Sequence, residues 1–116
     1  MNYTNNDLFS NQGILKTDMY QTNEYYTLKI EVAGFKKEDI QILLKDGNLT
    51  IQATKKPSEG KVIHQERFTG KCSRSFQIGN NITPQDIKAS FDNGELIITV
   101  PTQAKKQKES TFIQIF

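Results

Sequence analysis

His64 and Cys72 are the only histidine and the only cysteine of the 116-residue chain. A thiolate activated by an imidazole is a nucleophile, and on adjacent strands these two side chains could meet. Catalysis of this kind also needs a third group that orients the imidazole, and the sequence supplies no evident one. We therefore expect an exposed histidine and a half-buried structural cysteine, and no enzyme activity.

Other site chemistries also lack the residues they require. Metal ligation needs more His and Cys than the chain has, and the acidic residues are scattered, mostly in turns. Glycine-rich phosphate loops are absent, so we expect no cofactor. The net charge is only +2, and the pairs Lys55-Lys56 and Lys105-Lys106 have no aromatic neighbours. These features argue against a nucleic-acid partner.

Length and composition indicate one small domain with a modest core, since only 35% of the residues are hydrophobic. No apolar run is long enough to span a membrane, and the first residues lack the basic start and apolar block of a signal peptide. A lone cysteine fits a reducing compartment. We expect a soluble cytoplasmic protein.

Short alternating segments, separated by turn residues, make up the middle of the chain. In the clearest one, the turn Asp92-Asn93-Gly94 is followed by Leu96, Ile98 and Val100 on one face of a strand that ends at Pro101. Similar segments cover residues 17–20, 25–32, 40–45, 48–54, 71–78 and 87–91. With no long helix in sight, they predict an all-β, immunoglobulin-like antiparallel β-sandwich.

A further segment, residues 62–68, has a weak pattern in which Val62, His64, Glu66 and Phe68 share one face. A strand with so little apolar content is poorly held by its own sheet. It therefore predicts an edge strand or an excursion from the sandwich.

The two ends of the chain are mostly polar but carry apolar side chains. Residues 1–15 are Asn-rich and predict a flexible arm, which is either a disordered terminus or a sticky segment that contacts other protein chains through Leu8, Phe9, Ile14 and Leu15. Residues 102–111 predict a solvated linker. The apolar residues among 112–116 should dock somewhere, because burying them contributes several kcal/mol at about 25 cal/mol per Å².

Four motifs resemble those of the small heat-shock protein (alpha-crystallin) family. Ala89, Gly94 and Leu96, running into Ile-Thr-Val-Pro, are similar to its A-x-x-x-x-G-x-L signature. Residues 70–78 resemble G-x-F-x-R-x-F-x-L, with Cys72 in place of Phe, and residues 33–40 resemble a turn in which Ala33 replaces the usual Pro. Ile113-Gln114-Ile115 is similar to the family's I-x-I/V tail motif. The resemblance implies an N-terminal arm (1–15), an alpha-crystallin domain (16–101) and a C-terminal extension (102–116).

The resemblance also implies contacts between subunits. The tail residues Ile113 and Ile115 would insert into a groove of a neighbouring subunit, between residues 40–45 and 87–91. Its predicted walls are Ile42, Leu44, Ile87 and Ala89. Bacterial and plant members exchange a strand to form dimers, and residues 57–70 have the right length for that. The implied dimer interface comprises Val62, His64, Glu66, Phe68 and Arg74. Arg74 would pair with a carboxylate across the contact, and a purely local salt bridge is the alternative.

Two functions follow from the resemblance. The first is an ATP-independent holdase that binds partly unfolded proteins and prevents their aggregation, and that assembles with itself into homodimers and higher homo-oligomers. The second is a structural or regulatory assembly partner, or a CS-domain-like co-chaperone adaptor, with little client holding. The tail motif and the exchange loop favour the first, and the short arm keeps the second open.

Overall fold

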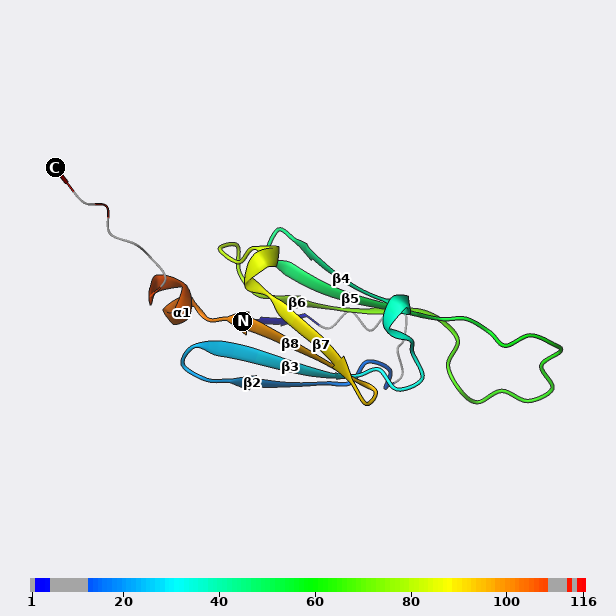
Figure 1. Cartoon of the computed structure of the whole chain (residues 1–116). Helices are drawn as coiled ribbons and strands as arrows, with labels where there is room; N and C mark the ends of the chain where they lie inside the picture. The colour runs from blue at the N-terminus through cyan, green and yellow to red at the C-terminus, as the bar shows by residue number, and fades with distance from the viewer. Residues whose placement is uncertain (1, 5–12, 109–112, 114) are drawn as a thin grey trace.

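Two four-stranded antiparallel sheets pack face to face in the computed structural model, which describes residues 2–4, 13–108, 113, 115 and 116 (Figure 1). One sheet has the strand order β1–β6–β5–β4 and the other β2–β3–β8–β7. The strands are β1 (Asn2–Thr4), β2 (Thr17–Gln21), β3 (Tyr25–Glu31), β4 (Ile40–Lys45), β5 (Asn48–Lys55), β6 (Gly70–Gln77), β7 (Lys88–Asp92) and β8 (Glu95–Pro101). The predicted all-β sandwich is confirmed.

Alternation of apolar and polar residues builds the core, because successive side chains of a strand point to opposite faces. The inward-facing side chains of β3, β5 and β8 are almost completely buried. They are Leu28 and Ile30, then Leu49, Ile51 and Ala53, and then Leu96, Ile98 and Val100. Phe76 of β6 fills the space between the sheets.

Two tight turns carry the backbone geometry that their residue types predict. Asp46 and Gly47 connect β4 to β5, and Asn93 and Gly94 connect β7 to β8, all four with positive φ. Two consecutive residues with positive φ form the two-residue turn that matches the right-handed twist of the strands in a hairpin. Gly94 lies close to the loop that follows β3, so a Cβ on Gly94 would be 3.2 Å from the Cα of Ala33.

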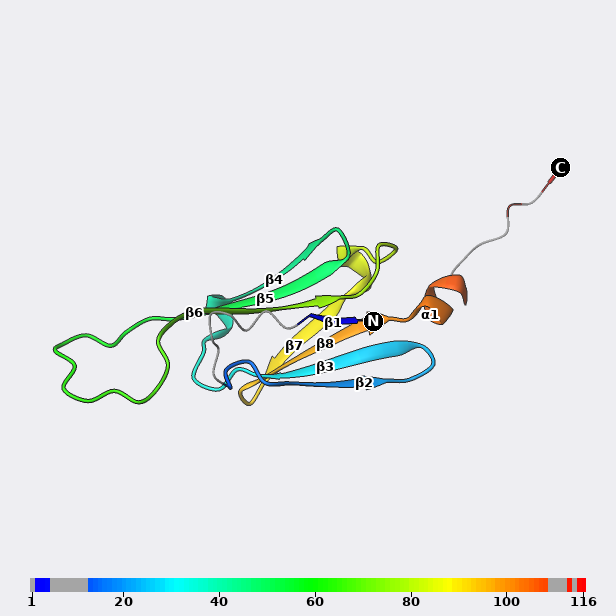
Figure 2. The same cartoon turned by 180° about the vertical axis from the view of Figure 1, so that it is seen from behind.

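Of the two predictions for residues 62–68, an edge strand or an excursion from the sandwich, the structure shows the excursion. The segment is part of a long loop between β5 and β6 that extends beyond the end of both sheets (Figure 2). In the part of the chain that the structure describes, no strand pairs with this segment, so its backbone joins no ladder there. Val62 and Ile63 are exposed, Ile63 to 91%.

The N-terminal arm also differs from the prediction. Leu15 is 1% exposed and belongs to the core, Ile14 packs against that core, and β1 pairs with β6 through Asn2 and Gln77. Leu15 is therefore not available for client contact, because it is enclosed by its own sandwich. Leu8 and Phe9 lie outside the described residues.

The predicted linker after residue 101 contains a short helix, α1 (Gln103–Lys108). Its polar sequence gives no apolar period, which is why the pattern alone predicted no element. In the part of the chain that the structure describes, no helix is long and apolar enough to cross a membrane.

Candidate functional site

A groove opens between β4 and β7, the last strands of their respective sheets. Its cavity has a volume of about 190 Å³. Apolar side chains from both sheets provide most of the lining: Ile40, Ile42, Ala89, Phe91 and Leu96, together with Lys37 and Ser90. The groove can therefore accept apolar side chains and, at its strand edges, an extended peptide.

Two of the four predicted wall residues, Ile42 and Ala89, line this cavity. Leu44, near the end of β4, and Ile87, just before β7, also pack against the core but do not line the cavity. The cavity lies toward the start of β4 and the end of β7, so it takes in Ile40 and Phe91, which the sequence analysis did not assign to it. Both share the alternation of Ile42 and Ala89, and that signal was available in the sequence.

The tail isoleucines are not bound to this chain's own groove. Ile113 and Ile115 are 92% and 94% exposed, and Phe116 is fully exposed. These side chains leave a large apolar area in water, which a partner surface would remove.

Arg74 is buried inside the sandwich of the single chain. The residue is 8% exposed, its Nη1 donates a hydrogen bond to the Leu15 carbonyl oxygen at 3.2 Å, and its guanidinium lies 5.4 Å from the centre of the Phe76 ring. Burial lowers the pKa of this guanidinium. Arg74 is in register with Ile51 on the inner face of its sheet, so its contacts in the single chain are internal, and the implied role in a dimer contact stays a prediction.

Cys72 and His64 occupy different environments. Cys72 is buried, its thiol lies 3.7 Å from the Ala53 carbonyl oxygen, and burial raises its pKa to about 11. His64 is exposed in the β5–β6 loop, with Nε2 2.9 Å from Glu66. A thiol that stays protonated at neutral pH is a poor nucleophile. Cys72 is thus more deeply buried than predicted, while His64 is exposed as expected.

Comparison with known proteins places this geometry in a family. The model of the Hsp20/alpha crystallin family matches residues 18–116. A probable Hsp20 family chaperone of onion yellows phytoplasma is 38% identical over 97% of this chain and 85% of its own length. Heat shock protein HSP.16.4 of Streptococcus thermophilus is 35% identical over 88% of this chain and 74% of its own.

Solved structures agree. Heat shock protein 16.0 from Schizosaccharomyces pombe superimposes with a TM-score of 0.71 at 28% identity, over 98% of this chain and 85% of that one. A small heat-shock protein from Xylella fastidiosa shares the fold, with a TM-score of 0.68 at 23% identity over 90% of this chain and 96% of its own. The chain therefore belongs to the Hsp20/alpha crystallin family, the small heat-shock proteins.

Proposed function

We propose that this protein is an ATP-independent holdase, which binds partly unfolded proteins and keeps them from aggregating. Membership of a family with chaperone relatives supports this role. Holding by mass action needs only an exposed apolar surface that binds the unfolded state, and no nucleotide. We also propose a cytoplasmic location, which a single buried cysteine suits.

The observation that carries the proposal is the coexistence of an open apolar groove and an exposed apolar tail on one chain. Ile113 and Ile115 of one subunit bind the β4–β7 groove of another, and assemblies form in this way. Full burial of an isoleucine side chain contributes about 1.5–3 kcal/mol. With two isoleucines, a single tail binds weakly enough to be released. Many such tail contacts together hold an assembly. A released tail then uncovers the groove for an unfolded client.

The exposed β5–β6 loop supports a second contact between subunits. Val62 and Ile63 are exposed on a segment that extends past both sheets. We propose that this loop, with Val62, His64, Glu66 and Phe68, pairs with a second copy to form a dimer. The proposed domain then comprises residues 16–101 together with Leu15, followed by the extension 102–116.

One observation favours the second candidate function, an assembly partner that holds clients poorly. Leu15 is in the core and Ile14 packs against it, so two of the four apolar residues proposed for client contact are engaged within the chain. A protein of this kind would assemble normally and leave client aggregation unchanged.

An aggregation assay tests the proposed function. A heat-labile model enzyme is heated without nucleotide, alone and with an equimolar amount of this protein, while light scattering is recorded. The proposal expects scattering to fall by more than half, with the same result when ATP is removed enzymatically. Undiminished scattering at a tenfold excess, from a protein that light scattering shows to be assembled, would establish the assembly partner instead.

A further inference from the structure

Helix α1, at the base of the tail, is capped and anchored by Thr102. The buried Thr102 hydroxyl donates to the Asn23 carbonyl oxygen at 2.7 Å, and the Thr102 amide donates to the Glu24 carbonyl oxygen at 2.8 Å. The same hydroxyl accepts a hydrogen bond from the Lys105 amide at 3.3 Å, which is the arrangement of a helix N-cap. One residue therefore starts the helix and ties it to the β2–β3 turn.

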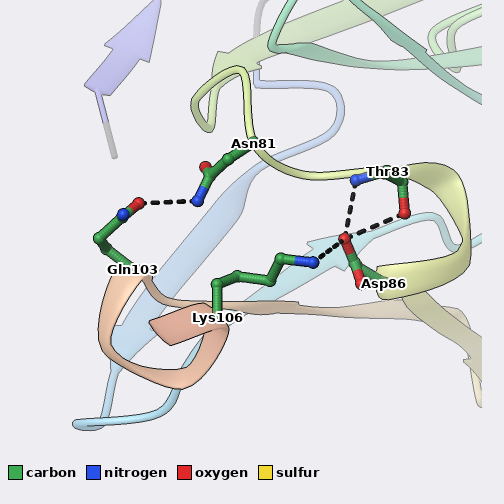
Figure 3. Close-up of polar contacts among 5 residues, drawn as sticks. All are labelled: Asn81, Thr83, Asp86, Gln103 and Lys106. Carbon is green, nitrogen blue, oxygen red and sulfur yellow. Dashed lines mark hydrogen bonds and ion pairs between the residues drawn. The ribbon is translucent and has the colours of Figure 1, made fainter. Parts of the chain in front are cut away.

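A second set of contacts ties the helix to the segment before β7 (Figure 3). Lys106 Nζ lies 3.0 Å from the carboxylate of Asp86, and Asn81 Nδ2 donates to Gln103 Oε1 at 2.8 Å. The amide and hydroxyl of Thr83 both donate to the same carboxylate, so Asp86 is held in place before Lys106 reaches it. The hydrogen bond from the Thr83 amide, with that from Lys106, lowers the pKa of Asp86 and keeps it charged at neutral pH.

These contacts decide whether α1 exists at all. Isolated helices shorter than about 12 residues are marginal in water, and α1 has six. The Lys106–Asp86 pair is largely shielded, with side chains 24% and 16% exposed. A shielded pair whose carboxylate is already oriented contributes more than an ordinary surface pair. The helix and its contacts with the sandwich therefore form together.

The helix also sets how far the tail reaches. Six residues advance about 9 Å as a helix but about 20 Å when extended, so α1 removes about 11 Å of tether. The roughly five residues from Lys108 to Ile113 span at most about 18 Å. The groove residues Ala89 and Leu96 lie on β7 and β8, about 10–17 Å back along the sheet from Pro101. In both views α1 and the C-terminus lie beyond one end of the sandwich, whereas β4 begins and β7 ends at the other end, where the groove residues are (Figures 1 and 2).

We propose that α1 is a latch that shortens the tail's tether and so directs Ile113 and Ile115 to the groove of a second copy of the chain rather than to its own. The inference rests on the proposed docking of the tail. With α1 unfolded, the roughly 11 residues from Thr102 to Ile113 span up to about 38 Å, enough to reach the subunit's own groove. A short flexible tether gives an effective concentration in the millimolar range, so at micromolar protein the released tail occupies its own groove.

Disulfide trapping distinguishes the two modes of docking. The full-length double variant Ser90→Cys/Phe116→Cys places one thiol in the groove lining and one at the end of the tail, while the buried Cys72 does not take part. Mild oxidation should give a ladder of linked subunits on a non-reducing gel when the latch is intact. Adding Lys106→Glu places a second carboxylate against that of Asp86 and should open the latch. The fraction of internally linked monomers should then rise at least tenfold over that of the double variant.

Matched variants and a second measurement complete the test. Lys106→Arg keeps the ion pair and should preserve the ladder, and Lys45→Glu changes the net charge equally at an exposed position of β4 and should also preserve it. Hydrogen exchange of the amides of residues 103–108 should accelerate in Lys106→Glu alone. A ladder that persists in Lys106→Glu, or unchanged exchange, overturns the latch and leaves the proposed docking intact. Absence of any linked product with the latch intact overturns both.

Discussion

The guanidinium of Arg74 donates a hydrogen bond to the backbone carbonyl oxygen of Leu15, 59 residues earlier in the chain. Leu15 has a φ of 60°, an unfavourable conformation for a non-glycine residue, and its carbonyl also accepts a hydrogen bond from the Thr17 hydroxyl at 2.9 Å. The two donors hold the segment that leads into β2 against the inner face of β6. Arg74 thus fixes where the N-terminal segment enters the core.

Replacing Arg74 should therefore destabilise the fold. Arg74→Ala removes a buried hydrogen bond from a charged donor and leaves a cavity beside Phe76, so we expect the free energy of unfolding to fall by about 2–4 kcal/mol. Arg74→Lys should be intermediate, because an ammonium retains a donor but not the planar guanidinium. Urea unfolding measures the free energy of unfolding of both variants. The protein concentration is kept fixed, since the stability of an assembling protein depends on it.

Arg67→Ala, at an exposed loop position, is the control and should change the free energy of unfolding by no more than about 0.5 kcal/mol. Equal effects of Arg67→Ala and Arg74→Ala would contradict this role.

A side chain at Gly94 should destabilise the fold. Its φ is +74°, and a Cβ would lie 3.2 Å and 3.3 Å from the Cα and Cβ of Ala33. Gly94→Ala therefore combines backbone strain with a tight contact against Ala33, and we expect a loss of about 1–3 kcal/mol in thermal or urea unfolding. Gly60 is the matched control, because it also has positive φ but no atom within 4 Å of its Cβ position. Gly60→Ala should cost clearly less, and the opposite order would show that contact with Ala33 does not matter.

The strands could be predicted because local pattern and global fold agree there. Leu96, Ile98 and Val100 alternate, Asn93 and Gly94 supply the turn, and the inward face is buried as expected. The segment 62–68 has a weaker alternation, which left an edge strand and an excursion open. A strand needs a neighbour, and among the described residues no strand lies beside this loop.

Part of the site could be predicted for the same reason. The alternation that made Ile42 and Ala89 candidates also places Ile40 and Phe91 in the groove, but where along the strands the cavity lies depends on how the two sheets diverge. The inward position of Arg74 and the burial of Leu15 depend on each other across the sandwich. Helix α1 depends on contacts with Asp86 and Asn23 that are remote in sequence. Local patterns carry no information about such pairs.

Cys72 should be unreactive in the folded protein. With the pKa raised by burial to about 11, roughly one thiol in a thousand is ionised at pH 8, and the side chain is enclosed as well. Alkylation by iodoacetamide at pH 8 should be at least a hundredfold slower than in denaturant. Because the folded thiol holds its proton more tightly than the unfolded one, stability should also decline as pH rises from about 9 to about 11. Rapid alkylation under native conditions would place the thiol at the surface.

Blocking the groove should have the same effect as removing the tail. Ala89 is exposed and lines the cavity, so Ala89→Glu introduces bulk and charge where an apolar side chain is to bind, without altering the buried core. If Ile113 and Ile115 dock there, the loss of about 1.5–3 kcal/mol for each displaced isoleucine weakens each contact by at least about tenfold. The molar mass from light scattering should then fall toward that of a dimer, as it should after truncation following Thr111.

Gln41→Glu is the matched control, because it adds the same charge on the other face of β4 and should leave the mass unchanged. If truncation reduced the mass while Ala89→Glu did not, the tail would bind elsewhere on the partner, and the outer strand edges of β4 and β7 would have to be tested separately.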